Sequence, residues 1–446
     1  MRGLTVNDMD FQQRDHDRPG EAGIRIRTFI EGRDGTFAGR TVESSAGLDE
    51  LGAGSNFQNG RVSSARRTGH TSLGDPASRS SAQAARRASF GAVNLNGLMP
   101  HRVQIAARDL PPGSFALVMA SGIIAIALDL TGHHTVSLIP AGVTGAGYLL
   151  LILMTGYRVI VFPAAFAADF QSRSRSVGHF TFVAGTNVVG VLALLRGWPA
   201  AAIPLFTVGV LAWLVLGYVV PWSVLLGRRD CAVLPEVDGT WLLWAVSSHS
   251  VAIASADLEV AYVGVRQYLA ALAILAWALG VVQYGVVVVV LLLRFAARPM
   301  CPADLDPSYW VSMGALAITA VAGAQITEMD RAPMVNATRA VIAGLSVIAW
   351  CVATWLIPVL VAVGWWRHIR HRIPLRYEPG LWSLVFPLGM YAVAGIDLGR
   401  ADHLPLVQTI GAAWSWVATA VWATVLVAST RIVPGGDVTA NRRCRR

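Results

Sequence analysis

His249 is the residue of this sequence with the clearest capacity for chemistry inside an apolar environment. It stands in the polar run Ser247-Ser248-His249-Ser250, in the middle of a long apolar segment. An imidazole in that position could bind an anion or relay a proton, because its charge changes near neutral pH. A histidine that is hydrogen-bonded to a neighbouring helix is the ordinary alternative. The residue type alone leaves both interpretations open.

Signatures of catalysis are missing from the sequence. The motifs HExxH and GxGxxG do not occur, GxSxG has no catalytic context, and no paired carboxylates stand within the apolar segments. The four cysteines are scattered without CxxC spacing: Cys231, Cys301, Cys351 and Cys444. We therefore predict no catalytic residue, no metal site and no cofactor.

Small, polar or kinking residues also mark the centres of alternate apolar segments. These groups are Ser121-Gly122, Gly185-Thr186-Asn187, Ser247–Ser250, Met313-Gly314 with Thr319, and Phe386-Pro387-Leu388-Gly389. Pro387 has no backbone N–H to donate and should kink its helix. Such residues can line a passage, or they can simply let helices pack closely. The alternation predicts helical hairpins whose first members lie inside and whose second members lie outside.

The elements that must position these residues are membrane-spanning helices. Hydrophobic residues make up 54% of the 446 positions and charged residues only 14%, against about 25% charged in soluble domains. Many apolar runs reach the roughly 20 residues that cross a bilayer. We predict an all-α polytopic membrane protein with ten transmembrane helices, near residues 113–130, 138–161, 178–195, 200–226, 240–256, 268–293, 308–327, 340–364, 380–396 and 405–429.

Charge in the loops predicts the orientation of these helices. Arginine gathers on the cytoplasmic side of membrane proteins. The loop between spans eight and nine carries four arginines between residues 367 and 376, whereas the loop between spans five and six carries Asp257 and Glu259 with one arginine. The alternation holds in every loop except that between spans seven and eight, which is neutral. We predict a multi-pass protein of the cell membrane with both termini in the cytoplasm.

The net charge of +9 comes from 36 basic residues, all of them arginine. Because these arginines stand in tails and loops that flank the spans, they indicate contact with a lipid bilayer and no nucleic-acid partner. Arginine without lysine, together with much alanine, valine and glycine, is typical of a GC-rich bacterial coding sequence. The predicted spans carry almost no formal charge, which argues against a pump or a carboxylate-coupled antiporter.

Three regions follow from these patterns. Residues 1–108 are polar, rich in arginine and without apolar periodicity, which predicts a disordered N-terminal tail. Met99 is an alternative natural start of the chain. Residues 109–431 form the ten-helix domain, and residues 432–446 form a basic cytoplasmic tail.

Three segments carry a resemblance to a known family. They are Pro111-Pro112-Gly113-Ser114-Phe115 leading into Met119-Ala120-Ser121-Gly122, then Asp306–Trp310 with Ser312–Ala315, and Trp382-Ser383-Leu384-Val385-Phe386-Pro387-Leu388-Gly389-Met390-Tyr391. Together they resemble the tellurite-resistance/C4-dicarboxylate transporter family, which shares its fold with the plant slow-type anion channels. The likeness runs from about residue 110 to about residue 430.

The resemblance implies five helical hairpins around a central pore that the odd-numbered helices line, and in many members a homotrimer with one pore in each subunit. It further implies that Phe386, just before Pro387, closes the pore as a gate. The implied partners are small organic or inorganic anions: malate and other C4-dicarboxylates, sulfite, tellurite, chloride or nitrate. Candidates for lining the pore are then Ser121, Gly122, Thr186, Asn187, Ser248, His249, Gly314 and Pro387.

Three hypotheses about function compete on this basis. The first is transport of small anions through a pore with neutral walls, whose selectivity comes from helix ends, small polar groups and width. The second is a proton-coupled dicarboxylate carrier that uses His249. The third, from another class, is a membrane-embedded enzyme or sensor, and no catalytic motif supports it.

Overall fold

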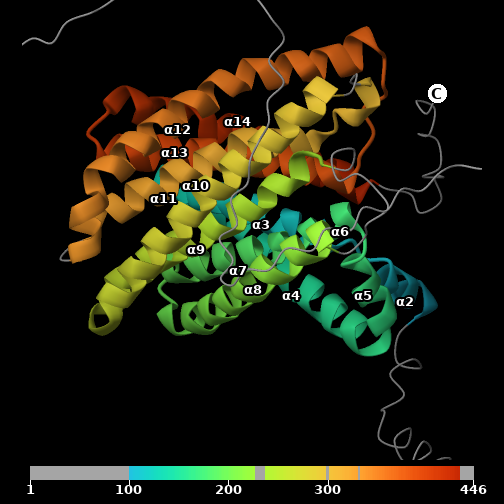
Figure 1. The fold of residues 1–446 in the computed structure, drawn as a ribbon, viewed down its shortest axis with the longest axis horizontal. Coiled ribbons are helices and arrows are strands. Elements are labelled where there is room, and N and C mark those ends of the chain that lie inside the picture. Colours follow the sequence, from blue (N-terminus) through green and yellow to red (C-terminus); the bar gives the residue numbers. More distant parts are fainter. Residues whose placement is uncertain (1–99, 227–236, 298–300, 330–331, 432–446) are drawn as a thin grey trace, which may run out of the picture. The chain divides into compact units, whose positions relative to one another are not determined.

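The computed structural model describes residues 100–226, 237–297, 301–329 and 332–431, and these residues form helices without any strand. Every predicted span matches one long helix (Figure 1). The long helices are α3 (Ala116–Leu130), α4 (His134–Val161), α7 (Phe180–Leu195), α8 (Pro199–Leu226), α9 (Leu243–Ala261), α10 (Arg266–Ala297), α11 (Val311–Glu328), α12 (Pro333–Trp365), α13 (Trp382–Ala401) and α14 (Pro405–Thr430). The prediction of an all-α polytopic membrane protein is confirmed.

Nine helices of the described residues are long and apolar enough to cross a membrane. The long helix outside that set is α9, which carries Asp257 and Glu259 near its end and several serines in its middle. Its residues are nonetheless buried along most of its length. The number of ten spans therefore stays a prediction, with α9 as the helix on which it depends.

The long helices pack as hairpins around a closed ring. Consecutive helices pair as α3 with α4, α7 with α8, α9 with α10, α11 with α12, and α13 with α14. The first members also pack on one another in the order α3, α7, α9, α11 and α13, and α13 returns to α3. We call α3, α7, α9, α11 and α13 the inner helices and their hairpin partners the outer helices.

Burial separates the inner helices from the outer ones. The most apolar 18-residue window is 72–83% buried in α3, α7, α11 and α13, but only 17–39% buried in the outer helices. Leu150, Val215 and Val282 are examples of large apolar side chains that the outer helices expose. In a membrane protein such side chains face lipid, because only hydrocarbon accepts them without cost.

All five inner helices begin at the same end of the ring. A short helical turn precedes each of them: η2 (Pro112–Phe115), α6 (Arg173–Gly178), η4 (Gly239–Leu242), η7 (Pro307–Trp310) and η9 (Pro379–Leu381). These turns contact one another in that order. The inner helices therefore run parallel, and we call the two ends of the ring the N-terminal end and the C-terminal end.

Three arginines fix the chain just before inner helices. Each lies near the end of an outer helix, and each donates to the backbone carbonyl that stands two residues before a short turn. The pairs are Arg158 with Leu110, Arg294 with Val237, and Arg367 with Leu305. Because the same contact recurs in three hairpins, it ties the outer helices to the N-terminal end of the ring.

Arg158→Ala is expected to lower the free energy of unfolding by about 3–5 kcal/mol, the usual cost of breaking a buried ion pair. The guanidinium of Arg158 lies 2.6 Å from a carboxylate oxygen of Asp169, and both side chains are less than 5% exposed. Thermal unfolding of the detergent-solubilised protein measures the loss. The matched control is Arg175→Ala, since Arg175 pairs with the same Asp169 but is 41% exposed and should contribute about 1 kcal/mol or less. Equal losses in the two variants would contradict the prediction.

The structure differs from the sequence predictions in the tail and the loops. The last residues of the predicted tail form a helix, α2 (His101–Arg108), and the loop between α4 and α7 contains α5 (Pro163–Asp169) and α6. The predictions for residues 1–99, which include the alternative start at Met99, and for residues 432–446 lie outside the described residues.

Two inner helices are longer than predicted. Helix α9 continues to Ala261 and α13 to Ala401, so that Asp257, Glu259 and Asp397 lie within helices and not in loops. The prediction ended each span at its first carboxylate. One of these carboxylates is neutralised within the fold, since Glu259 pairs with Arg266 of α10. The predicted spans 240–256 and 380–396 hold no charged residue, and the charges lie where α9 and α13 continue beyond these bounds.

Candidate functional site

A narrow cavity lies inside the ring, and all five inner helices line it. Each helix contributes at least one aliphatic side chain: Ile123, Val188, Ile253, Val321 and Val393. About 40 Å³ of the cavity is open to the centre of a water molecule, which is room for about three waters. A cavity of this size admits no C4-dicarboxylate.

Three polar side chains line this central cavity: Asn187 of α7, Ser250 of α9 and Gln325 of α11. The Nδ2 of Asn187 donates to the Oγ of Ser250 at 3.0 Å, while its buried Oδ1 has no hydrogen-bond partner among the described residues. The Nε2 of Gln325 lies 3.4 Å from a carboxylate oxygen of Asp397. An ion inside the ring would therefore meet amide and hydroxyl groups and no basic side chain.

One face of α13 extends along the whole cavity. Met390 and Val393 line it, and helical spacing places Phe386 four residues before Met390 and Asp397 four residues after Val393 on the same face. Phe386 is 2% exposed and belongs to the main hydrophobic core. Phe386 thus stands toward the N-terminal end of the cavity, and Asp397 stands toward its C-terminal end.

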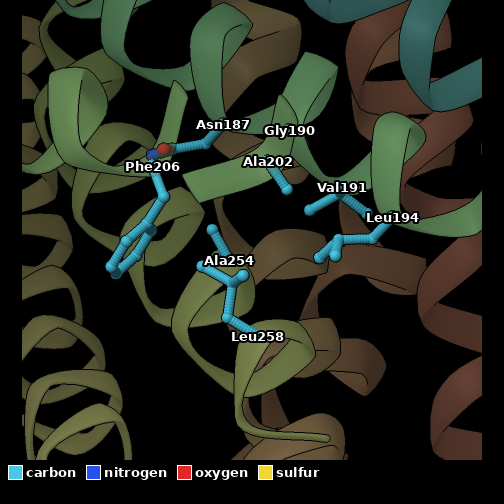
Figure 2. A pocket seen from close by; sticks show the side chains of 8 residues that line it. All are labelled: Asn187, Gly190, Val191, Leu194, Ala202, Phe206, Ala254 and Leu258. Carbon is cyan, nitrogen blue, oxygen red and sulfur yellow. The ribbon is translucent and has the colours of Figure 1, made fainter. Parts of the chain in front are cut away.

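A second, smaller gap lies between α7, α8 and α9, outside the ring (Figure 2). Figure 2 shows the amide of Asn187 at one end of the gap and Leu258 at the other. The gap has no room for the centre of a water molecule, so it is a packing defect and not a ligand site. Asn187 borders both spaces and forms part of the wall between them.

Three of the predicted pore residues face outer helices. Ser121 accepts a hydrogen bond from the indole of Trp422 on α14 at 3.0 Å. The hydroxyl of Thr186 lies 3.2 Å from that of Tyr148 on α4. Ser248 accepts a hydrogen bond from the indole of Trp213 on α8 at 2.9 Å. Each of these three contacts joins an inner helix to an outer helix of a neighbouring hairpin, and none of the three hydroxyl groups lines the central cavity.

His249 lies between α9, α10 and α11. Its Nε2 is 3.2 Å from the hydroxyl of Thr319 on α11. A Cβ added to Gly280 of α10 would lie 2.5–2.8 Å from the imidazole ring, so the ring fills the space that this glycine leaves open. These contacts agree with the interpretation of His249 as a histidine hydrogen-bonded to a neighbouring helix.

The remaining predicted residues mark close contacts between inner helices. A Cβ on Gly314 of α11 would lie 2.8 Å from the ring of Pro387 on α13, and a Cβ on Gly122 of α3 would meet Val188 of α7. The structure brings Gly314 and Pro387 together in one contact. Of the eight predicted pore residues, Asn187 is the one that lines the central cavity.

Sequence reasoning missed two carboxylates of the inner helices. Asp257 follows the cavity residues Ser250 and Ile253 at helical spacing on α9, and Asp397 follows Met390 and Val393 in the same way on α13. Both carboxylates therefore stand toward the C-terminal end of the ring, where their charges repel each other. The signal that could have found them is this spacing, because each carboxylate continues the stripe of its helix that faces the ring axis.

Comparison with known proteins agrees with this geometry. The family model described as voltage-dependent anion channel matches residues 109–430. Two uncharacterized membrane proteins of Mycobacterium tuberculosis, from strains CDC 1551 / Oshkosh and ATCC 25618 / H37Rv, are each 56% identical over 135 residues, which cover 30% of this chain and 68% of the relative. An uncharacterized transporter of Methanocaldococcus jannaschii is 21% identical over 231 residues, which cover 52% of this chain and 66% of that protein.

These matches point to a transporter or channel and not to an enzyme. The matched region contains all ten long helices, the central cavity and the two carboxylates. The chain belongs to the voltage-dependent anion channel family, whose members move anions across membranes.

Proposed function

We propose that this chain carries small anions along the axis of the ring of inner helices, and that Phe386 closes this pathway. The observation that carries the proposal is the central cavity, because all five inner helices line it. A gap that results only from imperfect packing, such as the gap of Figure 2, lies between neighbouring helices and not on the axis of the ring.

Helix dipoles supply an attraction for anions that needs no basic side chain. The N-terminus of a helix carries about half a positive charge, and five parallel inner helices begin at one end of the ring. An anion that enters from the N-terminal end meets this combined field before it reaches the amides of Asn187 and Gln325. Neutral donors bind weakly enough to let an ion leave again, which conduction requires.

The orientation follows from loop charge. The loop after α12 carries Arg367, Arg370, Arg372 and Arg376 and lies at the N-terminal end of the ring. By the positive-inside rule that end faces the cytoplasm, so anions leave the cell by passing first Phe386 and then the central cavity. The pathway needs residues of one chain alone, and a homotrimer would therefore hold three separate pathways.

A proton-coupled carrier that uses His249 is less well supported. The imidazole lies next to the hydroxyl of Thr319 and packs against Gly280. It does not line the central cavity. We therefore expect His249→Ala to leave the dependence of uptake on a proton gradient unchanged. Loss of this dependence in His249→Ala would restore the histidine as the proton relay.

Flux through reconstituted protein tests the proposal. Liposomes containing the purified chain are compared with protein-free liposomes for efflux of malate, succinate, sulfite, nitrate and chloride, each with and without a proton gradient. We expect at least one of these anions to leave faster from the protein-containing liposomes. The Phe386→Ala variant is included, since a closed gate could hide transport by the natural chain. Absence of anion flux in both proteins would contradict the proposal.

A further inference from the structure

Asp257 and Asp397 both stand toward the C-terminal end of the cavity. Each continues the stripe of cavity residues on its own helix, and the two helices stand on either side of α11 in the ring. Gln325 of α11 lines the cavity between them, and its Nε2 lies 3.4 Å from a carboxylate oxygen of Asp397. An ion moving along the axis past Val321 and Val393 would pass this group next.

The pair lacks the partners that two ionised carboxylates need. The Oδ2 of Asp257 and the Oε1 of Gln325 are inaccessible to solvent, and neither has a hydrogen-bond partner among the described residues. The two carboxylates repel each other, and Asp397 is also repelled by Glu328 of α11. Arg400 attracts Asp397, but its side chain also donates to the carbonyl of Leu130.

Other charged groups on the surrounding elements have their own partners. The sequences of α8 and α14 contain no charged residue. Toward this end of the ring, Arg196 and His134 pair with Asp129, Arg266 pairs with Glu259, and Arg339 donates to the carbonyl of Met329. Asp257 therefore has no basic side chain among the described residues to neutralise it.

We propose that Asp257 and Asp397 form a proton-binding site in the anion pathway, and that an anion passes the C-terminal end of the ring when this pair is protonated. The inference rests on the proposed function and adds its regulation. Two adjacent carboxylates in a site of low dielectric favour the uptake of a proton, because both cannot stay ionised without strong repulsion. The ligand of this site is the proton, supplied from the side of the membrane that the C-terminal end faces.

The sign of the pH effect follows from charge alone. With both carboxylates ionised, the pair presents negative charge to an approaching anion and slows its passage. Protonation removes that charge, so anion flux should rise as the pH falls. The repulsion between two unit charges in a partly buried site is large enough for a rise of about tenfold or more. A pathway with neutral walls would show no such dependence.

The test is the pH profile of anion flux with the same pH on both sides of the liposome, which removes the effect of mixed orientation. Flux is measured from pH 5 to pH 8 for the natural chain, Asp257→Asn, Asp397→Asn and the double variant. We expect the natural chain to be faster at acid pH by about tenfold. Each Asn variant should be fast at pH 8 and should respond less to pH, and the double variant should respond least.

The matched control is Glu259→Gln. Glu259 stands on the same helix two residues after Asp257, but it is buried against Arg266 and not in the stripe that lines the cavity. Its substitution should leave the pH profile unchanged. Size-exclusion chromatography verifies that each variant is folded. If one Asn variant does not fold, the other one decides; if neither folds, the profile of the natural chain against Glu259→Gln decides.

The possible failures are distinguishable. Flux that is present in the natural chain but equal at pH 5 and pH 8 would overturn the proton-binding site and leave the proposed function intact. Folded Asn variants that keep the natural pH profile, or a flux that follows Na⁺ concentration and not pH, would also overturn it. Absence of anion flux at every pH, with Phe386→Ala included, would instead refute the proposed function itself.

Discussion

Phe386→Ala is expected to raise anion flux by about tenfold or more. The Phe386 side chain is 2% exposed, and helical spacing places it on the face of α13 that carries the cavity residues Met390 and Val393, toward the N-terminal end. Truncation to alanine removes a ring from the narrow axis and extends the cavity toward the N-terminal end. A gain of tenfold needs the barrier to fall by only about 1.4 kcal/mol, which is less than the packing energy that a buried phenylalanine contributes.

The measurement is efflux from proteoliposomes, with the natural chain and Phe386→Ala reconstituted at equal protein density. Leu388→Ala is the matched control. Leu388 is also buried in α13, at 5% exposure, but it stands two residues away and so on a different face from Phe386, Met390 and Val393. Both truncations should destabilise the protein by several kcal/mol, so a leak caused by loosened packing would occur in both. Equal flux in the two variants would contradict a gate at Phe386.

Apolar run lengths predicted the long helices closely, because the bilayer fixes how many apolar residues a span must hold. Helix α8 (Pro199–Leu226), for example, matches the predicted span at 200–226 within one residue. The alternation of polar centres predicted which members of the hairpins lie inside, and the ring of α3, α7, α9, α11 and α13 confirms this arrangement.

The lining of the cavity could not be predicted from residue type. An inner helix is buried on all sides. Some of its polar residues line the central cavity, and others contact the outer helices. Ser121 and Ser248 hydrogen-bond to tryptophans of α14 and α8, whereas Asn187 lines the cavity. The rotation of each helix about its own axis decides which of its polar residues face the cavity. A single sequence gives no measure of that rotation.

The two carboxylates were missed for a different reason. Hydropathy places a span boundary at the first acidic residue, and Asp257 and Asp397 both follow long apolar segments. The helices continue for about one more turn because residues near their C-terminal ends are packed against other helices, so that Leu258 and Leu398 are buried. The boundary that composition predicts is therefore the point at which the inner helices α9 and α13 change from neutral to acidic.

Gly395→Val should prevent α13 and α14 from packing as closely as they do, and it should destabilise the protein strongly. A Cβ on Gly395 would lie 2.7 Å from the Cα of Gly411 and 3.0 Å from the carbonyl oxygen of Val407. These are backbone atoms of α14, which cannot rotate away as a side chain can, so the helices must separate. Overpacking usually costs about 1–3 kcal/mol, and a backbone clash belongs at or above the upper end of that range.

The matched control for this change is Gly145→Val on α4, since nothing lies within 4 Å of the position of its Cβ. Both substitutions place the same side chain within a long helix, so helix propensity affects them equally. We expect Gly145→Val to melt close to the natural chain in detergent and Gly395→Val to melt at a markedly lower temperature or to aggregate. Because α13 carries both Phe386 and Asp397, partial separation from α14 should also disturb the proposed gate and the proposed proton-binding site together. Similar melting temperatures for the two variants would show that the hairpin yields at this contact, and the close approach of α13 and α14 would then not be what holds α13 in the ring.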